Sequence, residues 1–455
     1  MALVANRQLS LFPKEKSSDK KSNGTSFCDP SFVLNKSVPM HRWVPWIAGF
    51  SGGFVRDVLL RYLGTKGVVL DPFAGVGTTL LEATLQGHDV IGFEINPYAA
   101  LACQTKMNAH NVALDKFEDS IEQFSIFYKE KTTSSYKPIS KPPEGFKTRH
   151  EFFSPKVLRK VLIIKDFINS VPDVLIRDLF RLAFGATLVS YSNYSYEPSL
   201  GRRSSVGKPE VIDFTVGETM LLKLREMEED IYWLGTQLKD KSSSVNIINN
   251  SFFNYESYLK QKSVDLVITS PPYLNNYHYN RNTRPHLYWL DYTKKPSDFQ
   301  MLEKSNFGKY WQTVRELEGV ELEFSLPDVD LEDRIKKLAK LNPEKGMYGG
   351  HGWANYAASY FNDCRRFALG LDFVLKPGGT ALVVIGNSIL QGMMIRTDEY
   401  FGKIAESVGL ELVAIEVPRK ARTGNSIIQS DVRVTKTKIS HQLYEAIVEL
   451  KKPHL

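Results

Sequence analysis

The sequence predicts an α/β fold with a mostly parallel sheet, helices on both faces and two long insertions. The first signal is a short apolar strand over 67–70, which leads through a glycine-rich turn into a helix over 78–86. The second is a strand over 89–93 followed by a helix over 97–110, so that strand and helix alternate as they do in a parallel sheet. The third is the return of strand-like runs after two interruptions.

Apolar runs predict the later strands of this sheet. We expect these strands over 245–248, 264–269, 373–375, 381–385, 410–417 and 444–450. The first interruption has a different character, because residues 154–190 and 216–236 carry apolar residues at helical spacing. The stretch 115–145, by contrast, is polar and rich in Pro, Lys and Ser.

This alternation divides the chain into six segments. The first is a tail, expected to be flexible because residues 13–30 are rich in Lys, Ser, Asp and Asn. The full set is the tail (1–35), the first part of the sheet domain (36–110), a helical insertion (111–240), a central strand segment (241–282), a second insertion (283–355) and the C-terminal strands (356–455).

Composition bounds the kind of protein. The chain has 455 residues, of which 42% are hydrophobic and 24% charged, which is typical of a globular protein and excludes disorder of the whole chain. It has no apolar run long enough to cross a bilayer and no secretory leader pattern, so we expect a cytoplasmic protein. Its three cysteines are far apart and predict neither a disulfide framework nor a metal site. A net charge of +7 favours an anionic partner.

The glycine-rich turn predicts a cofactor site. Asp71–Thr79 (DPFAGVGTT) joins strand to helix, and glycines there let the backbone pass close to a ligand. Glu94 follows Gly75 by 19 residues at the tip of the next strand, where a carboxylate can accept both hydroxyl hydrogens of a ribose. A dinucleotide fingerprint would need glycine at Leu80, and a phosphate loop would need lysine after Gly77. A nucleoside cofactor without phosphates therefore fits better than either, and a purely structural turn is the alternative.

A second motif follows the strand over 264–269. Ser270-Pro271-Pro272-Tyr273 has two prolines that fix the backbone, which by itself indicates a rigid turn. Beside a cofactor loop it suggests chemistry on an exocyclic amine, whose lone pair is delocalised into the ring. The Ser270 hydroxyl and the Pro271 carbonyl can accept the amine hydrogens, and Tyr273 offers a face for a base extruded from its duplex.

These two motifs carry a family resemblance. DPFAGVGTT with Glu94 resembles the S-adenosylmethionine site of class I methyltransferases, and SPPY resembles the catalytic motif of N4-cytosine and N6-adenine DNA methyltransferases. The resemblance implies a class I methyltransferase fold and S-adenosylmethionine as cofactor. It also implies that the backbone over 73–77 wraps the methionine part of S-adenosylmethionine and that Glu94 holds its ribose. Asn250 stands where the family often has an acid that contacts adenine. The implied cofactor-binding residues are Asp71, Phe73, Ala74, Gly75, Gly77, Thr78, Thr79, Glu94, Asn250 and Ser251.

Several reactions remain open under this resemblance. The serine form of the motif is most typical of cytosine-N4 enzymes, and adenine N6 is the alternative. Cytosine C5 methylation is disfavoured because Cys28, Cys103 and Cys364 do not follow proline, the typical position of its nucleophile. An RNA amino-methyltransferase would typically have Asp in place of Ser270, and a catalytically silent DNA-binding subunit is contradicted by the intact motifs.

Basic segments are the candidates for DNA contact. Residues 145–215 hold 11 Lys and Arg against 7 Asp and Glu, whereas 292–355 hold 10 against 11, so phosphate contact favours the first insertion as the target-recognition region. The candidate residues in its flexible loop are Arg202, Arg203 and Lys208. A second basic run adds Arg419, Lys420 and Arg422.

Two further segments suggest contacts. Residues 274–282 are dense in aromatic and amide side chains, which either line the base pocket or form an ordinary polar loop. Gln8-Leu9-Ser10-Leu11-Phe12 resembles the peptide with which bacterial proteins dock on the replication sliding clamp. The resemblance as a whole implies double-stranded DNA as substrate, and a restriction-modification system would add a cognate endonuclease.

Overall fold

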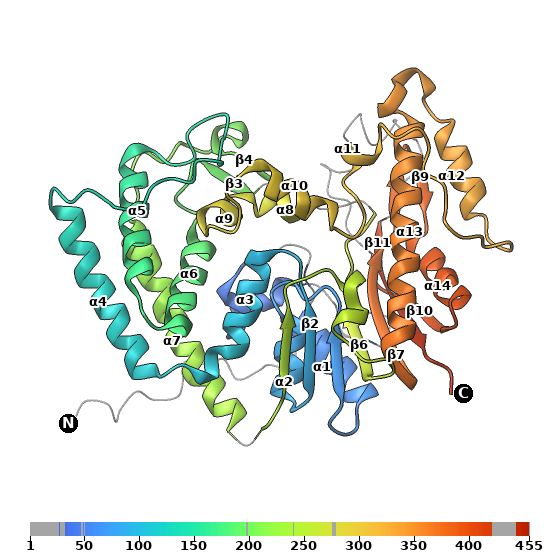
Figure 1. The fold of residues 1–455 in the computed structure, drawn as a ribbon, viewed down its shortest axis with the longest axis horizontal. Coiled ribbons are helices and arrows are strands. Elements are labelled where there is room, and N and C mark those ends of the chain that lie inside the picture. Colours follow the sequence, from blue (N-terminus) through green and yellow to red (C-terminus); the bar gives the residue numbers. More distant parts are fainter. Residues whose placement is uncertain are drawn as a thin grey trace.

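A seven-stranded sheet lies at the centre of the computed structural model, which describes residues 27, 32–46, 49, 51–196, 199–239, 241–274, 279–420 and 443–454 (Figure 1). The strand order is β10-β11-β7-β6-β1-β2-β5. Among the strands in these ranges, β11 alone runs in the direction opposite to the other six, and it pairs antiparallel with both β10 and β7. The predicted mostly parallel α/β fold is therefore confirmed. The strands are β1 (Val68–Asp71), β2 (Asp89–Phe93), β5 (Val245–Ile248), β6 (Val264–Thr269), β7 (Leu375–Gly386), β10 (Glu411–Lys420) and β11 (Tyr444–Lys451).

Successive residues of the central strands point to opposite faces of the sheet, and both faces are covered. Val69 and Leu266 pack in one apolar core, whereas Leu70 and Val267 pack in the other. The first core is closed by α1 (Gly52–Tyr62), α2 (Thr78–Leu85) and α3 (Pro97–Asn108), and the second by α13 (Gly350–Val374) and α14 (Thr397–Ser407). This burial explains why the strands read as nearly continuous apolar runs.

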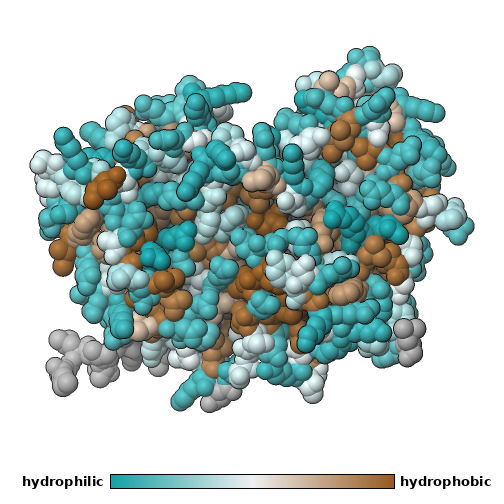
Figure 2. All heavy atoms as spheres, in the orientation of Figure 1, coloured by the Kyte–Doolittle hydropathy of each residue, from teal (hydrophilic) through white to brown (hydrophobic). Residues whose placement is uncertain are grey.

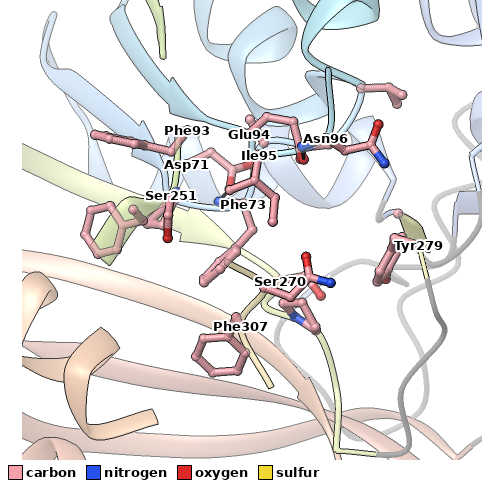
Figure 3. A pocket seen from close by; sticks show the side chains of 18 of the residues that line it. Asp71, Phe73, Phe93, Glu94, Ile95, Asn96, Ser251, Ser270, Tyr279 and Phe307 are labelled. Atoms are coloured by element: carbon pink, nitrogen blue, oxygen red, sulfur yellow. Dashed lines mark hydrogen bonds between the residues drawn. The ribbon is translucent and has the colours of Figure 1, made fainter. Parts of the chain in front are cut away.

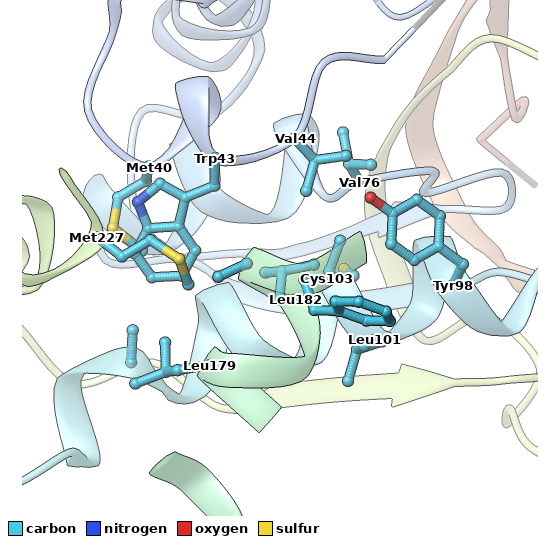
Figure 4. Close-up of a cluster of buried hydrophobic side chains, with 14 of the residues drawn as sticks. Met40, Trp43, Val44, Val76, Tyr98, Leu101, Cys103, Leu179, Leu182 and Met227 are labelled. Carbon is cyan, nitrogen blue, oxygen red and sulfur yellow. The ribbon is translucent and has the colours of Figure 1, made fainter. Parts of the chain in front are cut away.

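The first insertion forms a helical lobe that shares the first core. Its helices are α4 (Leu114–Thr133), α5 (Pro155–Ser170), α6 (Val174–Thr187) and α7 (Val216–Leu238). In Figure 4, Leu179 and Leu182 of α6 and Met227 of α7 lie near residues of α3 and of the N-terminal segment. Helix α4 occupies much of the stretch that is polar by composition. Its helical signal is the buried row Phe117, Ile121, Phe124 and Tyr128, spaced three or four residues apart.

The N-terminal segment is held on the helical lobe by one buried carboxylate. Asp230 of α7 accepts hydrogen bonds from the backbone nitrogen of Met40, from Arg42 and from the indole of Trp43. Phe27 is also buried. The predicted tail therefore includes residues that pack on the domain, while Gln8–Phe12 lies outside the described residues. The short helices here are η1 (Phe32–Ser37) and η2 (His41–Trp43).

The second insertion contributes to both sides of a notch. In Figure 1 its helices α9 and α10, with α8 just before them in the chain, lie beside the β3–β4 hairpin of the first insertion, whereas α11 and α12 lie beside α13. Figure 2 shows the notch at the upper edge of the molecule, with mainly hydrophilic side chains on its rims. The elements are β3 (Tyr194–Tyr196), β4 (Leu200–Arg202), α8 (Tyr279–Asn282), α9 (Arg284–Trp289), α10 (Pro296–Lys304), α11 (Trp311–Val314), α12 (Leu331–Ala339) and η6 (Pro343–Tyr348).

The boundary between α13 and β7 differs from the prediction. The strand predicted over 373–375 is wrong, because α13 continues to Val374 and β7 begins at Leu375. A second short hairpin, not predicted, follows β7. None of the helices in the described ranges is both long and apolar enough to cross a membrane. The remaining elements are the hairpin of β8 (Ser388–Leu390) and β9 (Met393–Ile395), η3 (Ala109–Asn111), η4 (Arg203–Val206) and η5 (Phe252–Ser257).

Candidate active site

A pocket opens at the carboxyl ends of β1, β2 and β6. Parallel neighbours end at the same edge, so motifs far apart in the sequence meet there. In Figure 3, Glu94 and Asn96 lie on one side of the pocket, Ser270 and Phe307 lie on the other, and Phe73 lies between them. The lining residues are Trp46, Gly49, Asp71–Val76, Thr78, Phe93–Asn96, Ser251, Phe252, Ser270, Pro272, Tyr279, Asn280 and Ser305–Phe307.

The glycine loop bends tightly around one end of this pocket. Gly75 and Gly77 have φ of 52° and 83°, the left-handed region in which side chains are strained. A Cβ at Gly77 would lie 2.8 Å from the Sγ of Cys103, and one at Gly75 would lie 3.3 Å from the indole nitrogen of Trp46. Backbone conformation therefore favours glycine at both positions, and lack of space also favours it at Gly77. The loop residues Phe73 to Val76 and Glu94 line the same pocket.

Glu94 joins the loop to the end of β2. Its carboxylate accepts hydrogen bonds from the backbone nitrogens of Gly75 at 2.8 Å and Asn96 at 2.7 Å. Burial raises the pKa of Glu94 to about 7, because desolvation of the charged form outweighs these two bonds. Glu94 lines the pocket, and its predicted contact with a ribose stays a prediction.

Asp71 links the cofactor loop to the strand that carries the second motif. Its Oδ1 accepts hydrogen bonds from the Thr269 hydroxyl at 2.6 Å and from the backbone nitrogen of Phe73 at 3.0 Å. The Thr79 hydroxyl donates to the carbonyl of Ile268 at 3.3 Å. Burial raises the pKa of Asp71 to about 6. These bonds join residues up to 198 positions apart and hold the two motifs in register.

The Ser-Pro-Pro turn is braced from two directions. The Tyr360 hydroxyl of α13 donates to the Pro272 carbonyl at 3.0 Å. The Ser270 hydroxyl donates to the Tyr273 hydroxyl at 3.5 Å, which in turn donates to Glu445 of β11 at 3.3 Å. Because both hydroxyl hydrogens point toward the carboxylate, the lone pairs of Ser270 are left to accept a hydrogen bond in the pocket. The arrangement makes Ser270 an acceptor.

Tyr273 lies outside the lining of the pocket, and its predicted stacking role stays a prediction. Its ring packs over Gly386 of β7, where a Cβ would come within 2.8 Å of the ring. Gly386 pairs with Glu445 on β11. Glycine leaves room for the ring of Tyr273, and the Glu445 carboxylate accepts its hydrogen bond, so the two residues together fix the position of the tyrosine. Ser270 and Pro272 line the pocket, whereas Pro271 and Tyr273 do not. The structure thus places the predicted stacking residue behind the serine.

Most of the predicted cofactor residues come together. Those that line the pocket are Asp71, Phe73, Ala74, Gly75, Thr78, Glu94 and Ser251. Gly77 lies just outside and precedes the first residue of α2, and Thr79 is buried beneath the loop. Asn250 also lies outside the lining, because its amide donates to Tyr258 and its carbonyl oxygen accepts from Asn254. The predicted adenine contact of Asn250 is therefore not formed by its present orientation.

Several lining residues were not named individually from the sequence. Trp46 of the N-terminal segment and Tyr279 of α8 stack with ring centroids 6.1 Å apart. Tyr279 and Asn280 fall in the aromatic and amide-rich segment 274–282, so composition held a signal for them. Phe307 follows α10 and packs on Phe73 at 5.3 Å. Neither Trp46 nor Phe307 stands in a local motif, and only the tertiary contacts reveal them.

Of the predicted DNA-contact residues, those in and after the β3–β4 hairpin lie near the pocket-lining helix α8. The β3–β4 hairpin rests on α8, because the Tyr196 hydroxyl and the Leu200 nitrogen both donate to Asn282. Arg202 also contacts His150 and Glu210. Arg203, the first residue of η4, donates to the carbonyl of Pro209, and Lys208 is exposed. Arg419 and Lys420 end β10, and Arg422 lies outside the described residues.

A known protein family matches residues in the first part of the sheet domain. A family described as DNA methylase, of the N6 and N4 type, matches residues 48–105. This range holds the glycine loop and Glu94. It does not reach the Ser-Pro-Pro-Tyr motif, which stands apart from the matched residues.

Curated relatives extend over most of the chain. The type II methyltransferase M.BsoBI of Geobacillus stearothermophilus is 25% identical over 431 residues, which cover 87% of this chain and 83% of that protein. The type II methyltransferase M.AvaI of Nostoc sp. (strain PCC 7120) is 24% identical over 435 residues, which cover 90% and 86%. Among solved structures, a putative DNA modification methylase from Thermus thermophilus, complexed with S-adenosylmethionine, has a TM-score of 0.23 and 12% identity. The match covers 45% of this chain and 54% of that one.

Proposed function

With the matches supporting a DNA methylase of the restriction-modification type that uses S-adenosylmethionine, we propose that this chain methylates the N4 amine of cytosine in duplex DNA. One observation carries the proposal. Ser270 and Pro272 line the same pocket as the Phe73–Gly75 loop and Glu94. An amine that donates a hydrogen bond to Ser270 therefore faces the cofactor loop across a single cavity.

One set of residues is proposed to hold the methyl donor, and another to orient the amine. The bound cofactor supplies an activated sulfonium methyl group. The loop over 73–77 and Glu94 hold the donor, and Ser270 accepts an amine hydrogen through the lone pairs that the Tyr273–Glu445 chain leaves available. Drawing the amine hydrogens toward acceptors localises the nitrogen lone pair, so positioning and electrostatics lower the barrier. The Pro271 carbonyl is the second proposed acceptor.

Base-resolution mapping of methylated nucleotides tests the proposal. DNA from cells that express the wild-type chain is compared with DNA from cells that express Ser270→Ala. N4-methylcytosine at one recurring sequence, lost in the variant, is the expected result. N6-methyladenine instead would select the alternative base. Purified protein that takes up S-adenosylmethionine yet transfers no methyl group to any duplex would overturn the proposal.

We assign the rim of the notch to DNA contact. Arg202, Arg203 and Lys208 belong to the hairpin segment that rests on α8, next to the pocket residues Tyr279 and Asn280. Arg419, Lys420 and Arg422 are proposed to hold the flanking backbone. Each lost phosphate contact lowers the slope of log affinity against log salt by about 0.9. Charge-removing variants of the hairpin residues should reduce that slope, and Lys403→Ala on α14 should not.

We propose two alternative roles for Tyr273, stacking on the extruded base or acting through Ser270. Stacking of Tyr273 on an extruded base would require its ring to leave Gly386, and Tyr273→Phe should then retain activity because the ring is kept. If Tyr273 acts through Ser270, the phenylalanine variant should lose activity.

We also propose that the N-terminal segment Gln8–Phe12 docks on the sliding clamp. A peptide of residues 8–12 with its flanking residues should bind the clamp, and the double substitution Leu11→Ala with Phe12→Ala should abolish that binding.

A further inference from the structure

Three asparagines line the pocket and form a chain of hydrogen bonds across it. Asn96 follows β2, Asn280 lies in α8, and Asn306 follows α10. The Asn96 amide nitrogen donates to Asn280 Oδ1 at 3.1 Å. The Asn280 amide nitrogen donates to Asn306 Oδ1 at 3.0 Å. The chain thus joins the end of β2 to the second insertion.

The direction of this chain is set by a helix terminus. Asn96 caps α3, and its Oδ1 accepts hydrogen bonds from the backbone nitrogens of Tyr98 and Ala99. Its amide nitrogen must therefore face outward, where it donates to Asn280 and to the hydroxyl of Thr283 at 2.7 Å. Each asparagine has one acceptor end and one donor end, so the orientation passes along the chain.

The chain ends with a donor at Asn306. Its oxygen accepts from Asn280, which leaves both hydrogens of Nδ2 for another partner. No residue in the described part of the chain accepts from that nitrogen. The neighbouring residue Phe307 packs on Tyr360, the side chain that holds the Pro272 carbonyl. Asn306 therefore lies on the side of the pocket that carries the Ser-Pro-Pro turn.

We propose that Asn306 is a base-contacting residue, whose Nδ2 donates to the ring nitrogen beside the amino carbon of the extruded base. This inference rests on the proposed function. Ser270 offers an acceptor and Asn306 a donor, which complement an amine and an adjacent ring nitrogen. Cytosine and adenine share this pattern of donor and acceptor. A uracil or thymine presents a carbonyl and a ring N–H in these positions. The Ser270 acceptor and the Asn306 donor would therefore disfavour both of these bases.

Asn306→Asp is the sharpest variant because it changes only the outer atom. The carboxylate still accepts from Asn280, so the chain stays intact, but lone pairs replace the donor. We expect the single-turnover methylation rate to fall about 100-fold for Asn306→Asp and about tenfold for Asn306→Ala, with cofactor Kd within twofold of wild type. Asn108→Asp at the end of α3 is the matched control and should leave the rate unchanged.

Asn280→Asp tests the direction of the chain. The introduced carboxylate accepts from Asn96 with one oxygen and presents the other to Asn306, whose amide then turns to donate and exposes its oxygen. The variant should therefore slow methylation as Asn306→Asp does, although residue 306 is unchanged. Wild-type rates in both aspartate variants would overturn the inference.

A modified substrate separates base contact from a structural role. The target base, once mapped, is replaced in a synthetic duplex by its analogue with carbon at that ring position, 3-deazacytosine or 1-deazaadenine. Wild type should lose about tenfold in rate on the analogue, and Asn306→Ala should lose nothing further. An equal loss in both proteins would refute the contact. A wild-type protein inactive on every duplex would instead refute the proposed function.

Discussion

The two sides of the pocket are built in different ways. The cofactor side comes from one continuous segment, Asp71–Thr79, together with Glu94 just after the adjacent strand. The transfer side is assembled from β6, α8, the residues after α10 and the hydroxyl of Tyr360 on α13. Backbone conformation determines the first side, and side-chain contacts between distant segments determine the second. Variants of the transfer side should therefore change methyl transfer, and variants of the loop should change folding and cofactor binding.

Ser270→Ala should produce the largest effect and should fall on catalysis alone. It removes the acceptor that faces the pocket, and loss of one such positioned polar group typically costs about 100-fold or more in rate. Single-turnover methylation measures the rate, and equilibrium dialysis measures cofactor Kd, which should stay within twofold. Ser407→Ala, which removes a hydroxyl at the end of α14, is the control. An equal loss of cofactor binding would contradict the division between the two sides.

Gly77→Ala should mainly reduce stability. The alanine would have to adopt φ of 83°, and its Cβ would lie 2.8 Å from Cys103 Sγ. We expect the free energy of unfolding to fall by about 2–3 kcal/mol, measured by chemical denaturation. Gly207→Ala has a similar φ of 73° with open space around it, so it isolates the backbone strain. Equal losses in the two variants would show that the contact with Cys103 costs nothing.

Cofactor affinity should depend on pH through Glu94. Because its pKa is raised to about 7, the carboxyl is protonated below that pH and cannot accept both ribose hydroxyl hydrogens. We expect cofactor Kd to rise about tenfold from pH 8 to pH 6 in wild type and to stay flat in Glu94→Gln. The same raised pKa favours the folded state at low pH, and this contribution is lost as pH rises toward 7. A wild-type Kd independent of pH would reject the ribose assignment.

Tyr360→Phe should have the smallest effect and should refine the transfer side. The variant keeps the ring that packs on Phe307 and removes only the hydroxyl that donates to Pro272. A rate loss of about fivefold with unchanged cofactor Kd corresponds to one ordinary hydrogen bond. Tyr400→Phe, which removes a hydroxyl bonded to Asp330, is the matched control. If both variants behave alike, the brace on the proline turn has no catalytic role.

The fold class and the core of the site could be predicted because their signals are local. Alternation of strand and helix, with glycines between them, follows from backbone sterics and apolar periodicity, and it indicated β1, α2, β2 and α3 within a few residues. Ser270-Pro271-Pro272-Tyr273 is likewise a continuous motif. The carboxyl ends of parallel strands meet at one edge of a sheet, so the meeting of the two motifs was also predictable.

Only the tertiary structure decided how side chains from separate segments orient one another. Tyr273 belongs to the motif, yet Gly386 and Glu445 determine where its ring lies. The N-cap of α3 sets the donor end of Asn306, which stands 210 positions after Asn96 in the chain. Hydrogen bonds between distant residues leave no periodic pattern in a sequence, because each depends on the folded path that brings its two partners together.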